Sequence, residues 1–125
     1  MYGVKLVLSK RKNRNFTTFK NRASVYILNT SFMVEYEAHG PWLHHFRETF
    51  IPALLEAGFE KPIFTKVMAD EMEGHFTYSL QVPMKDLERY KEFTEEMMPE
   101  YARQVSPVFG TQVLWFSSLL KKVDF

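Results

Sequence analysis

The order in which hydrophobic periodicity changes along the chain is the feature that most restricts its fold. Strand-like composition or alternation occupies four segments, namely Ser24–Tyr36, Ile63–Ala69, His75–Val82 and Thr111–Leu120. Between them lie two helical repeats, at Gly40–Gly58 and at about Lys85–Gln104. The chain therefore predicts the order strand–helix–strand–strand–helix–strand. A short acidic turn containing Gly74 joins the second and third strands into a hairpin.

This element order is that of the ferredoxin-like unit, so we expect an α+β sandwich with a four-stranded antiparallel sheet. Right-handed crossovers would place both helices on one face of that sheet. The predicted strand order is last–first–third–second. The opposite face would carry no helix, and any function has to be sought there.

Prolines mark the expected interruptions. Pro41 suits the first position of the first helix, where a missing N–H has no consequence. Pro52 lies inside that helix and predicts a kink near Thr49–Ile51. We expect Pro83 to end the third strand and Pro99 to kink the second helix.

Charge divides the 125 residues into two parts. Residues 1–23 hold seven basic residues and no acid, which leaves nine basic and 15 acidic residues for the rest. A basic tail could bind nucleic acid weakly. The adjoining domain is acidic, however, and the tail has no amphipathic repeat long enough to dock. We therefore expect a disordered N-terminal extension at residues 1–23, a domain at residues 24–125, and no nucleic-acid partner.

The cellular location is predicted from the absence of a membrane-spanning segment, a secretory signal and cysteine. No stretch approaches the roughly 18 apolar residues of a membrane span. The N-terminus places a short apolar run before a basic cluster, which is the reverse of a secretory signal. The chain contains no Cys, which removes disulfides, thiolate nucleophiles and Cys-based zinc sites. We expect a cytoplasmic protein without a membrane partner.

The helix-free face combines polar and apolar side chains. His75, Thr77, Ser79 and Gln81 alternate with the core residues of the third strand. The neighbouring first strand adds a face with apolar ends and a polar centre, made by Val25, Ile27, Asn29, Ser31 and Met33.

Packing two copies face to face would bury the apolar ends, so we expect a homodimer through this face. The enclosed polar groups would need water, each other or a ligand. The candidate ligand-binding residues are Asn29, Ser31, Thr77, Ser79 and Gln81. A hydrogen-bonded cluster across the dimer without any ligand remains the alternative.

Several segments resemble one family. They are VYILNTSFMVE, the helix WLHHFRETFIPALLEAGF, EGHFTYSLQV and FGTQVLWFSSLLKKV, with N-T-S-F, W-L…I-P and T-Y-S-L-Q as the most specific parts. Over about Val25–Val123 the chain resembles a bacterial family known as domain of unknown function 4286, allied by fold to the dimeric α/β-barrel superfamily. Members usually begin close to the first strand, so Met1–Ala23 departs from the pattern. The resemblance implies a fold and a dimer, without catalytic residues to transfer.

Two functional hypotheses follow. The first is a homodimeric interaction or small-ligand-binding module without catalysis. The second, suggested by the superfamily, is a small cofactor-independent monooxygenase-like enzyme that uses the polar face with His75 as its acid–base residue. No metal-binding, phosphate-binding or nucleophile motif is present in the sequence. We therefore lean towards a non-catalytic protein, and we expect no metal and no cofactor.

Overall fold

The computed structural model describes residues 24–68 and 74–125. Four strands are present in this part of the chain: β2 (Tyr26–Glu35), β3 (Ile63–Lys66), β4 (His75–Met84) and β5 (Val113–Lys121). The first helical segment comprises α1 (Tyr36–His45), a π-helical turn (Phe46–Phe50) and α2 (Ile51–Glu56). The second comprises α3 (Leu87–Glu92), a π-helical turn (Phe93–Met97), α4 (Met98–Phe109) and a 3₁₀ turn (Gly110–Gln112).

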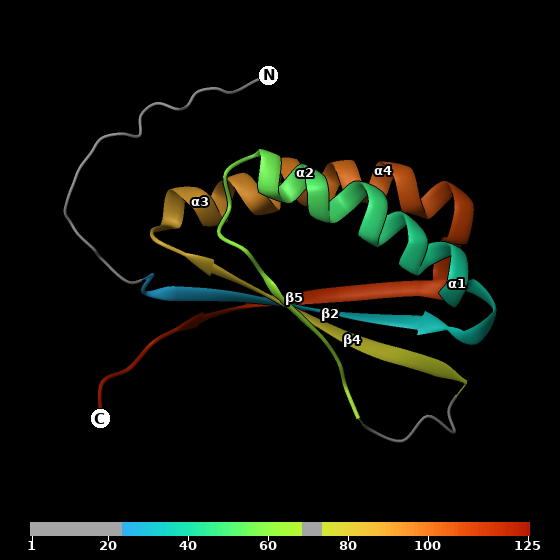
Figure 1. Cartoon of the computed structure of the whole chain (residues 1–125), viewed down its shortest axis with the longest axis horizontal. Coiled ribbons are helices and arrows are strands. Elements are labelled where there is room, and N and C mark those ends of the chain that lie inside the picture. Colours follow the sequence, from blue (N-terminus) through green and yellow to red (C-terminus); the bar gives the residue numbers. More distant parts are fainter. Residues whose placement is uncertain (1–23, 69–73) are drawn as a thin grey trace.

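The strands form one antiparallel sheet in the order β3-β4-β2-β5. This is the predicted order, and both helical segments lie on the same face of the sheet (Figure 1). The fold is α+β and consistent with the ferredoxin-like arrangement, as the element order predicts. β2 is the strand that pairs on both sides along its length, with β4 on one side and β5 on the other.

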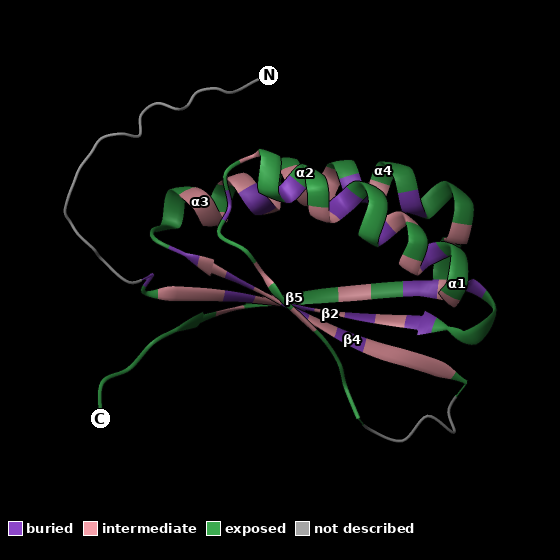
Figure 2. Cartoon of the chain, in the orientation of Figure 1, coloured by how far each residue is buried: buried purple, intermediate pink, exposed green. Residues whose placement is uncertain are grey.

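The core lies between the sheet and the helices (Figure 2). Alternate residues of the central strands point into it, so that Leu28, Phe32 and Leu80 are completely buried. Trp42, Phe46, Phe50 and Leu54 recur every four residues along the first helical segment and are buried against the sheet. The helical repeat predicted for this segment and the predicted orientation of β4 are therefore confirmed.

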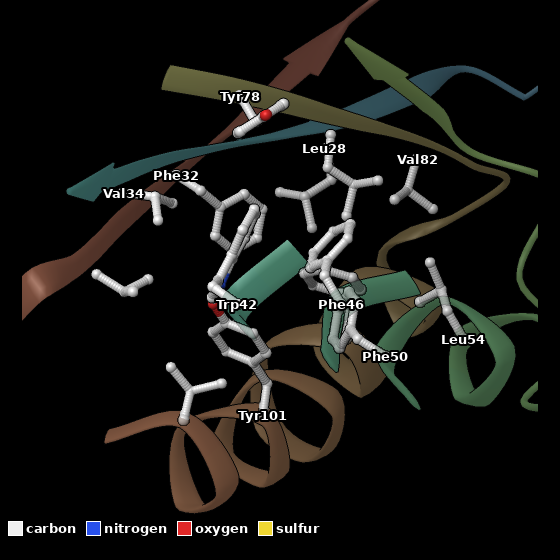
Figure 3. Close-up of a cluster of buried hydrophobic side chains, with 14 of the residues drawn as sticks. Leu28, Phe32, Val34, Trp42, Phe46, Phe50, Leu54, Tyr78, Val82 and Tyr101 are labelled. Atoms are coloured by element: carbon white, nitrogen blue, oxygen red, sulfur yellow. The ribbon is translucent and has the colours of Figure 1, made fainter. Parts of the chain in front are cut away.

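Phe32 is the side chain around which the aromatic core is arranged (Figure 3). Its ring centroid lies 5.4 Å from Trp42, 5.2 Å from Phe46 and 5.6 Å from Tyr101. Trp42 Nε1–H donates a hydrogen bond of 2.7 Å to the Tyr101 hydroxyl, which links the two helical segments across the core. Burial raises the pKa of Tyr101 far above its ordinary value, so the hydroxyl stays protonated.

Pro41 does not begin the first helix, which corrects the prediction. The helix begins directly after β2, at Tyr36, and Pro41 lies inside it. This earlier start places Ala38 one turn before Trp42, and both residues are buried in the core. Burial of the first turn therefore outweighs the hydrogen bond that the proline cannot make.

Pro52 and Pro99 each follow a π-helical turn. In both helical segments the residue before the proline donates its backbone N–H five residues back, from Ile51 to Phe46 and from Met98 to Phe93. Each proline then occupies one of the first two positions of the next α-helix, where its missing N–H is tolerated. The chain accommodates both prolines by locally widening the helix, at the places where interruptions were expected.

Pro83 does not end the third strand, because β4 continues to Met84. The hydrogen-bonded pairs between β2 and β4 alternate, and the pair that includes Pro83 and Ile27 is a non-bonded one. The proline nitrogen thus points towards the side of β3, whose first residue Ile63 already lies opposite Gln81. No ladder hydrogen bond is lost, which is why the strand tolerates the proline.

The ends of the second helical segment also differ from the prediction. It begins at Leu87, where Asp86 caps it by accepting a hydrogen bond of 3.0 Å from the Arg89 backbone N–H. It continues past Gln104 to Phe109 and stops at Gly110, whose φ of 57° ends the helix.

The expected basic extension at residues 1–23 and most of the expected acidic turn lie outside the described residues.

The Trp42–Tyr101 hydrogen bond generates a stability prediction. We expect Tyr101→Phe to lower the free energy of unfolding by about 1–3 kcal/mol, because it leaves the buried indole N–H of Trp42 without an acceptor. Tyr90→Phe, on a half-buried tyrosine of the same helical segment, is the matched control and should change stability less. Urea denaturation followed by tryptophan fluorescence measures both. Equal effects of the two variants would contradict the role of this bond.

Candidate functional site

Seven uncharged polar side chains gather at the centre of the helix-free face. We call this set the polar patch: Asn29, Ser31, Thr65, Thr77, Ser79, Gln81 and Ser118. The register fixes their positions, because residues directly opposite each other in a sheet share a face. Asn29 lies between Gln81 and Ser118, and Ser31 lies beside Ser79. All five predicted ligand-binding residues therefore share one surface.

Asn29 and Ser79 are hydrogen-bonded within this polar patch. The Ser79 hydroxyl donates to Asn29 Oδ1 at 2.6 Å, across a diagonal between the two central strands. This bond orients the Asn29 amide. The other amide and hydroxyl groups of the polar patch can each donate and accept hydrogen bonds. Ser31, Thr77 and Gln81 are half-buried, so their polar groups are accessible from this face. The arrangement can therefore hydrogen-bond an uncharged polar molecule or a second protein surface.

Large apolar side chains surround the polar patch on the same face. We call them the apolar rim: Val25, Ile63, Val67, Leu114, Phe116 and Leu120. Their exposed fractions range from 38% for Val25 to 57% for Ile63. Single exposed apolar residues are common on proteins, whereas a contiguous group with a polar centre is typical of an interaction site.

His75, the candidate acid–base residue, lies apart from the centre of the polar patch. It is the first residue of β4 and faces Glu35 at the end of β2. Four residues separate it from Ser79, which corresponds to about 13 Å along the strand. A ligand at the Asn29–Ser79 pair would therefore have to extend along the sheet to reach the imidazole.

Sequence reasoning missed two members of the polar patch, Thr65 and Ser118. Thr65 lies opposite Ser79 on the short strand β3, and Ser118 lies opposite Asn29 on β5. The predicted strand order already placed the last strand beside the first. Extending the alternation of the first strand to that neighbour is the signal that could have found Ser118.

A second group of interacting polar and aromatic side chains, not predicted from the sequence, lies on the helix side of the sheet near the start of α1. His39 Nε2 is hydrogen-bonded to the Tyr78 hydroxyl, and its ring lies 4.5 Å from Phe76. Lys66 Nζ lies 4.2 Å from the centre of the Phe76 ring. Burial, and secondarily the positive charge of Lys66, lower the pKa of His39. The lowered pKa favours the neutral imidazole, and either His39 Nε2 or the Tyr78 hydroxyl can donate in this hydrogen bond.

The described residues contain no group of three or more histidine, aspartate or glutamate side chains arranged to hold a metal ion. Within residues 24–68 and 74–125, every helix falls short of the length and apolarity that a bilayer crossing requires.

In the part of the chain that the structure describes, fold and surface together define a small α+β domain in which helices cover one face of the sheet and not the other. A family model described as "Domain of unknown function (DUF4286)" matches residues 25–123. The chain belongs to this family. The resemblance seen in the sequence is thereby confirmed for the family itself.

Comparison with curated proteins finds no match. Among solved structures, the fold is similar to two crystal structures of the PelD 158-CT fragment from Pseudomonas aeruginosa PAO1, one of them in complex with c-di-GMP. Sequence identity is 13% in both, and the TM-scores are 0.46 and 0.47. The matches cover 78% of this chain and 32% of the PelD chains, so the chain spans about a third of their length. A likeness at this level carries no argument about function.

The environment of His39 generates a pH prediction. Since its pKa is lower in the folded chain than the ordinary 6.5, folding favours the neutral imidazole. The resulting stability is present above pH 6.5 and is lost as the pH falls below it. We expect the free energy of unfolding to fall less between pH 7.5 and 5 in His39→Gln than in the wild type.

His44→Gln is the matched control, because His44 is an exposed histidine of the same helix. His39→Gln should reduce the pH dependence of the free energy of unfolding more than His44→Gln does. Denaturant melts at several pH values measure all three proteins, and an unchanged slope in His39→Gln would contradict the assignment.

Proposed function

We propose that the chain is a homodimeric module that binds a small ligand, in which two copies pack their helix-free sheet faces together in the manner of a dimeric α/β barrel. The observation that carries the proposal is the combination of the apolar rim with the polar patch on one uncovered face. Joining two such faces would remove the rim from water and enclose the polar patch between the sheets.

The apolar rim supplies the driving force for this contact. Ile63, Leu114 and Phe116 each expose half or more of their surface in a single chain. Each buried Å² of apolar surface stabilises an interface by about 25 cal/mol. The rim residues come from strands at both edges of the sheet, so a second sheet can contact them together while it spans the centre.

The area of the helix-free face determines how much of that face the dimer contact has to bury. Three of the strands have nine or ten residues and extend about 30 Å, β3 has only four residues, and the four strands together span about 15–20 Å. The footprint is therefore at most about 500 Å² before side-chain relief is counted, whereas a stable interface buries about 800 Å² per partner. Nearly the whole face is needed, and a charge at its centre should prevent the contact.

The polar patch indicates the chemistry of the ligand. It consists of amides and hydroxyls, and none of its seven side chains carries a charge. Buried hydroxyl and amide groups without hydrogen-bond partners cost about 1–3 kcal/mol each. The polar groups of an enclosed patch therefore need partners. An uncharged molecule with several hydrogen-bonding groups fits this requirement better than a phosphate or a carboxylate.

The dimer is tested with a charge at the centre of the face. We expect the wild type to be at least dimeric at tens of micromolar, and Ser31→Arg to halve its mass without a large change in melting temperature. Thr49→Arg, at an exposed position of the first helical segment, is the matched control and should leave the mass unchanged. Light scattering after size exclusion measures all three, and a monomeric wild type would overturn the proposal.

Ligand binding is tested by thermal shift with a library of neutral polyols, sugars and amides. A compound that raises the melting temperature of the wild type should lose that effect in Asn29→Ala and in Gln81→Ala. Thr49→Ala, outside the face, should retain it. Persistence of the shift in both patch variants would place the compound elsewhere. A dimer in which no library compound produces a shift would favour the ligand-free hydrogen-bonded cluster.

A further inference from the structure

The two edges of the sheet differ in how well they are protected against pairing with another strand. At one edge, β3 has only four residues, follows Pro62 and ends at Lys66. Short length, proline and lysine are the usual means by which proteins keep a sheet edge from pairing. At the other edge, β5 has nine residues, of which only the last, Lys121, is charged. β5 is therefore an unprotected edge.

The hydrogen-bond pattern shows which backbone groups of β5 point outward. The Lys122 N–H donates to the Val25 carbonyl at 2.9 Å, and bonded pairs alternate along an antiparallel ladder. The even-numbered residues 114–120 consequently bond to β2. The outward-pointing N–H and C=O groups belong to the odd-numbered residues, among them Trp115, Ser117 and Leu119. Within the described part of the chain, these three have no hydrogen bond to the backbone of another element.

The surroundings of β5 leave this edge open. A hollow of about 380 Å³ lies beside the start of the strand, lined by Ser106, Gly110, Thr111, Val113, Leu114 and Trp115. It lies between the end of α4 and the start of the strand. Ser117, in the middle of the strand, is exposed as well.

We propose that β5 pairs antiparallel with β5 of a second copy, which joins the two sheets into one continuous eight-stranded sheet. The midpoint of Val113–Lys121 is Ser117, whose backbone groups point outward. A two-fold axis at Ser117 therefore aligns outward groups with outward groups along the whole strand. In this register the two copies of Ser117 form a hydrogen-bonded pair at the axis.

The side chains support the same register. On the helix-free face, Leu114 lies opposite Leu120 of the second copy, and Phe116 lies opposite Ser118 of the second copy. On the helix side, Trp115 lies opposite Leu119 of the second copy, beside the hollow at the start of the edge. Aromatic and branched apolar pairs across strands are favourable, whereas like charges opposite each other are not. Lys121 lies opposite Val113 of the second copy, so no like charges meet.

This contact differs from the face-to-face dimer of the proposed function. It uses outward backbone groups at the sheet edge, whereas the face contact uses side chains of the polar patch and the apolar rim. Each contact is made by the same surface on both copies, so each can close around its own two-fold axis. A chain that makes both contacts assembles beyond the dimer.

The edge is tested with Ser117→Pro. Proline removes an N–H that the β2–β5 ladder does not use, and edge strands tolerate it at such positions. Ser117→Ala is the matched control, because both variants lose the hydrogen bond of 2.8 Å between the Ser117 and Thr30 hydroxyls. By light scattering at tens of micromolar, we expect Ser117→Pro to have half the mass of Ser117→Ala, with an unchanged circular dichroism spectrum.

The outcomes separate the two contacts. Equal masses for Ser117→Pro and Ser117→Ala would overturn the edge pairing and leave the face dimer standing. A loss of mass in Ser117→Pro but not in Ser31→Arg would support the edge and overturn the face.

Amide exchange in the wild type tests the edge pairing of β5 even if Ser117→Pro unfolds. In residue-resolved amide exchange, the N–H groups of Phe116 and Ser118 are protected by β2 in any state of association. Edge pairing predicts comparable protection for Trp115, Ser117 and Leu119. Fast exchange of these three amides in the folded protein would overturn the proposal.

Discussion

The antiparallel pairing of β2 with both β4 and β5 is the constraint on which the rest of the structure depends. This pairing fixes which residues of three strands share a face. Leu28 and Phe32 point to the helices and form the centre of the core, whereas Asn29 and Ser31 point away. A shift of one residue in the register would exchange the two sets. The register that buries the aromatic cluster is therefore the same register that places the polar patch on the opposite face.

The aromatic cluster in turn holds the helices in place. Phe32 contacts Trp42 of the first helical segment and Tyr101 of the second, and these two side chains are hydrogen-bonded. Both segments are thereby attached to one side of the sheet. Within the described residues, no helix covers the other side. The uncovered face and the unprotected edge at β5 are consequences of one topology, which concentrates the helices on one surface.

Much of this arrangement could be predicted from the sequence because it depends on periodicity. The alternation in His75–Val82 and the four-residue spacing from Trp42 to Leu54 state directly which side chains are buried. The strand order followed from the handedness of the crossovers. Membership of one face then placed all five predicted ligand-binding residues on a single surface.

The prolines were less predictable because their effect depends on hydrogen bonds between distant segments. Pro83 is tolerated within β4 because β3 is too short to need its N–H, and the length of β3 is not evident from local sequence. Pro41 lies within a helix because Ala38 is buried one turn before Trp42. The His39–Tyr78 pair was missed for a similar reason, since its members are 39 residues apart in the chain and meet only through packing.

The central claim is that the uncovered face forms a contact between two copies. Because the chain contains no cysteine, Ser31→Cys and Thr49→Cys each provide a unique site for a spin label. Sheets that pack face to face lie about 10 Å apart, with the helices on the outside. Continuous-wave electron paramagnetic resonance, in which dipolar broadening increases as two labels approach, should therefore show broader lines for labels at position 31 than for labels at position 49. Lines at position 31 that are no broader than those at position 49 would contradict the account.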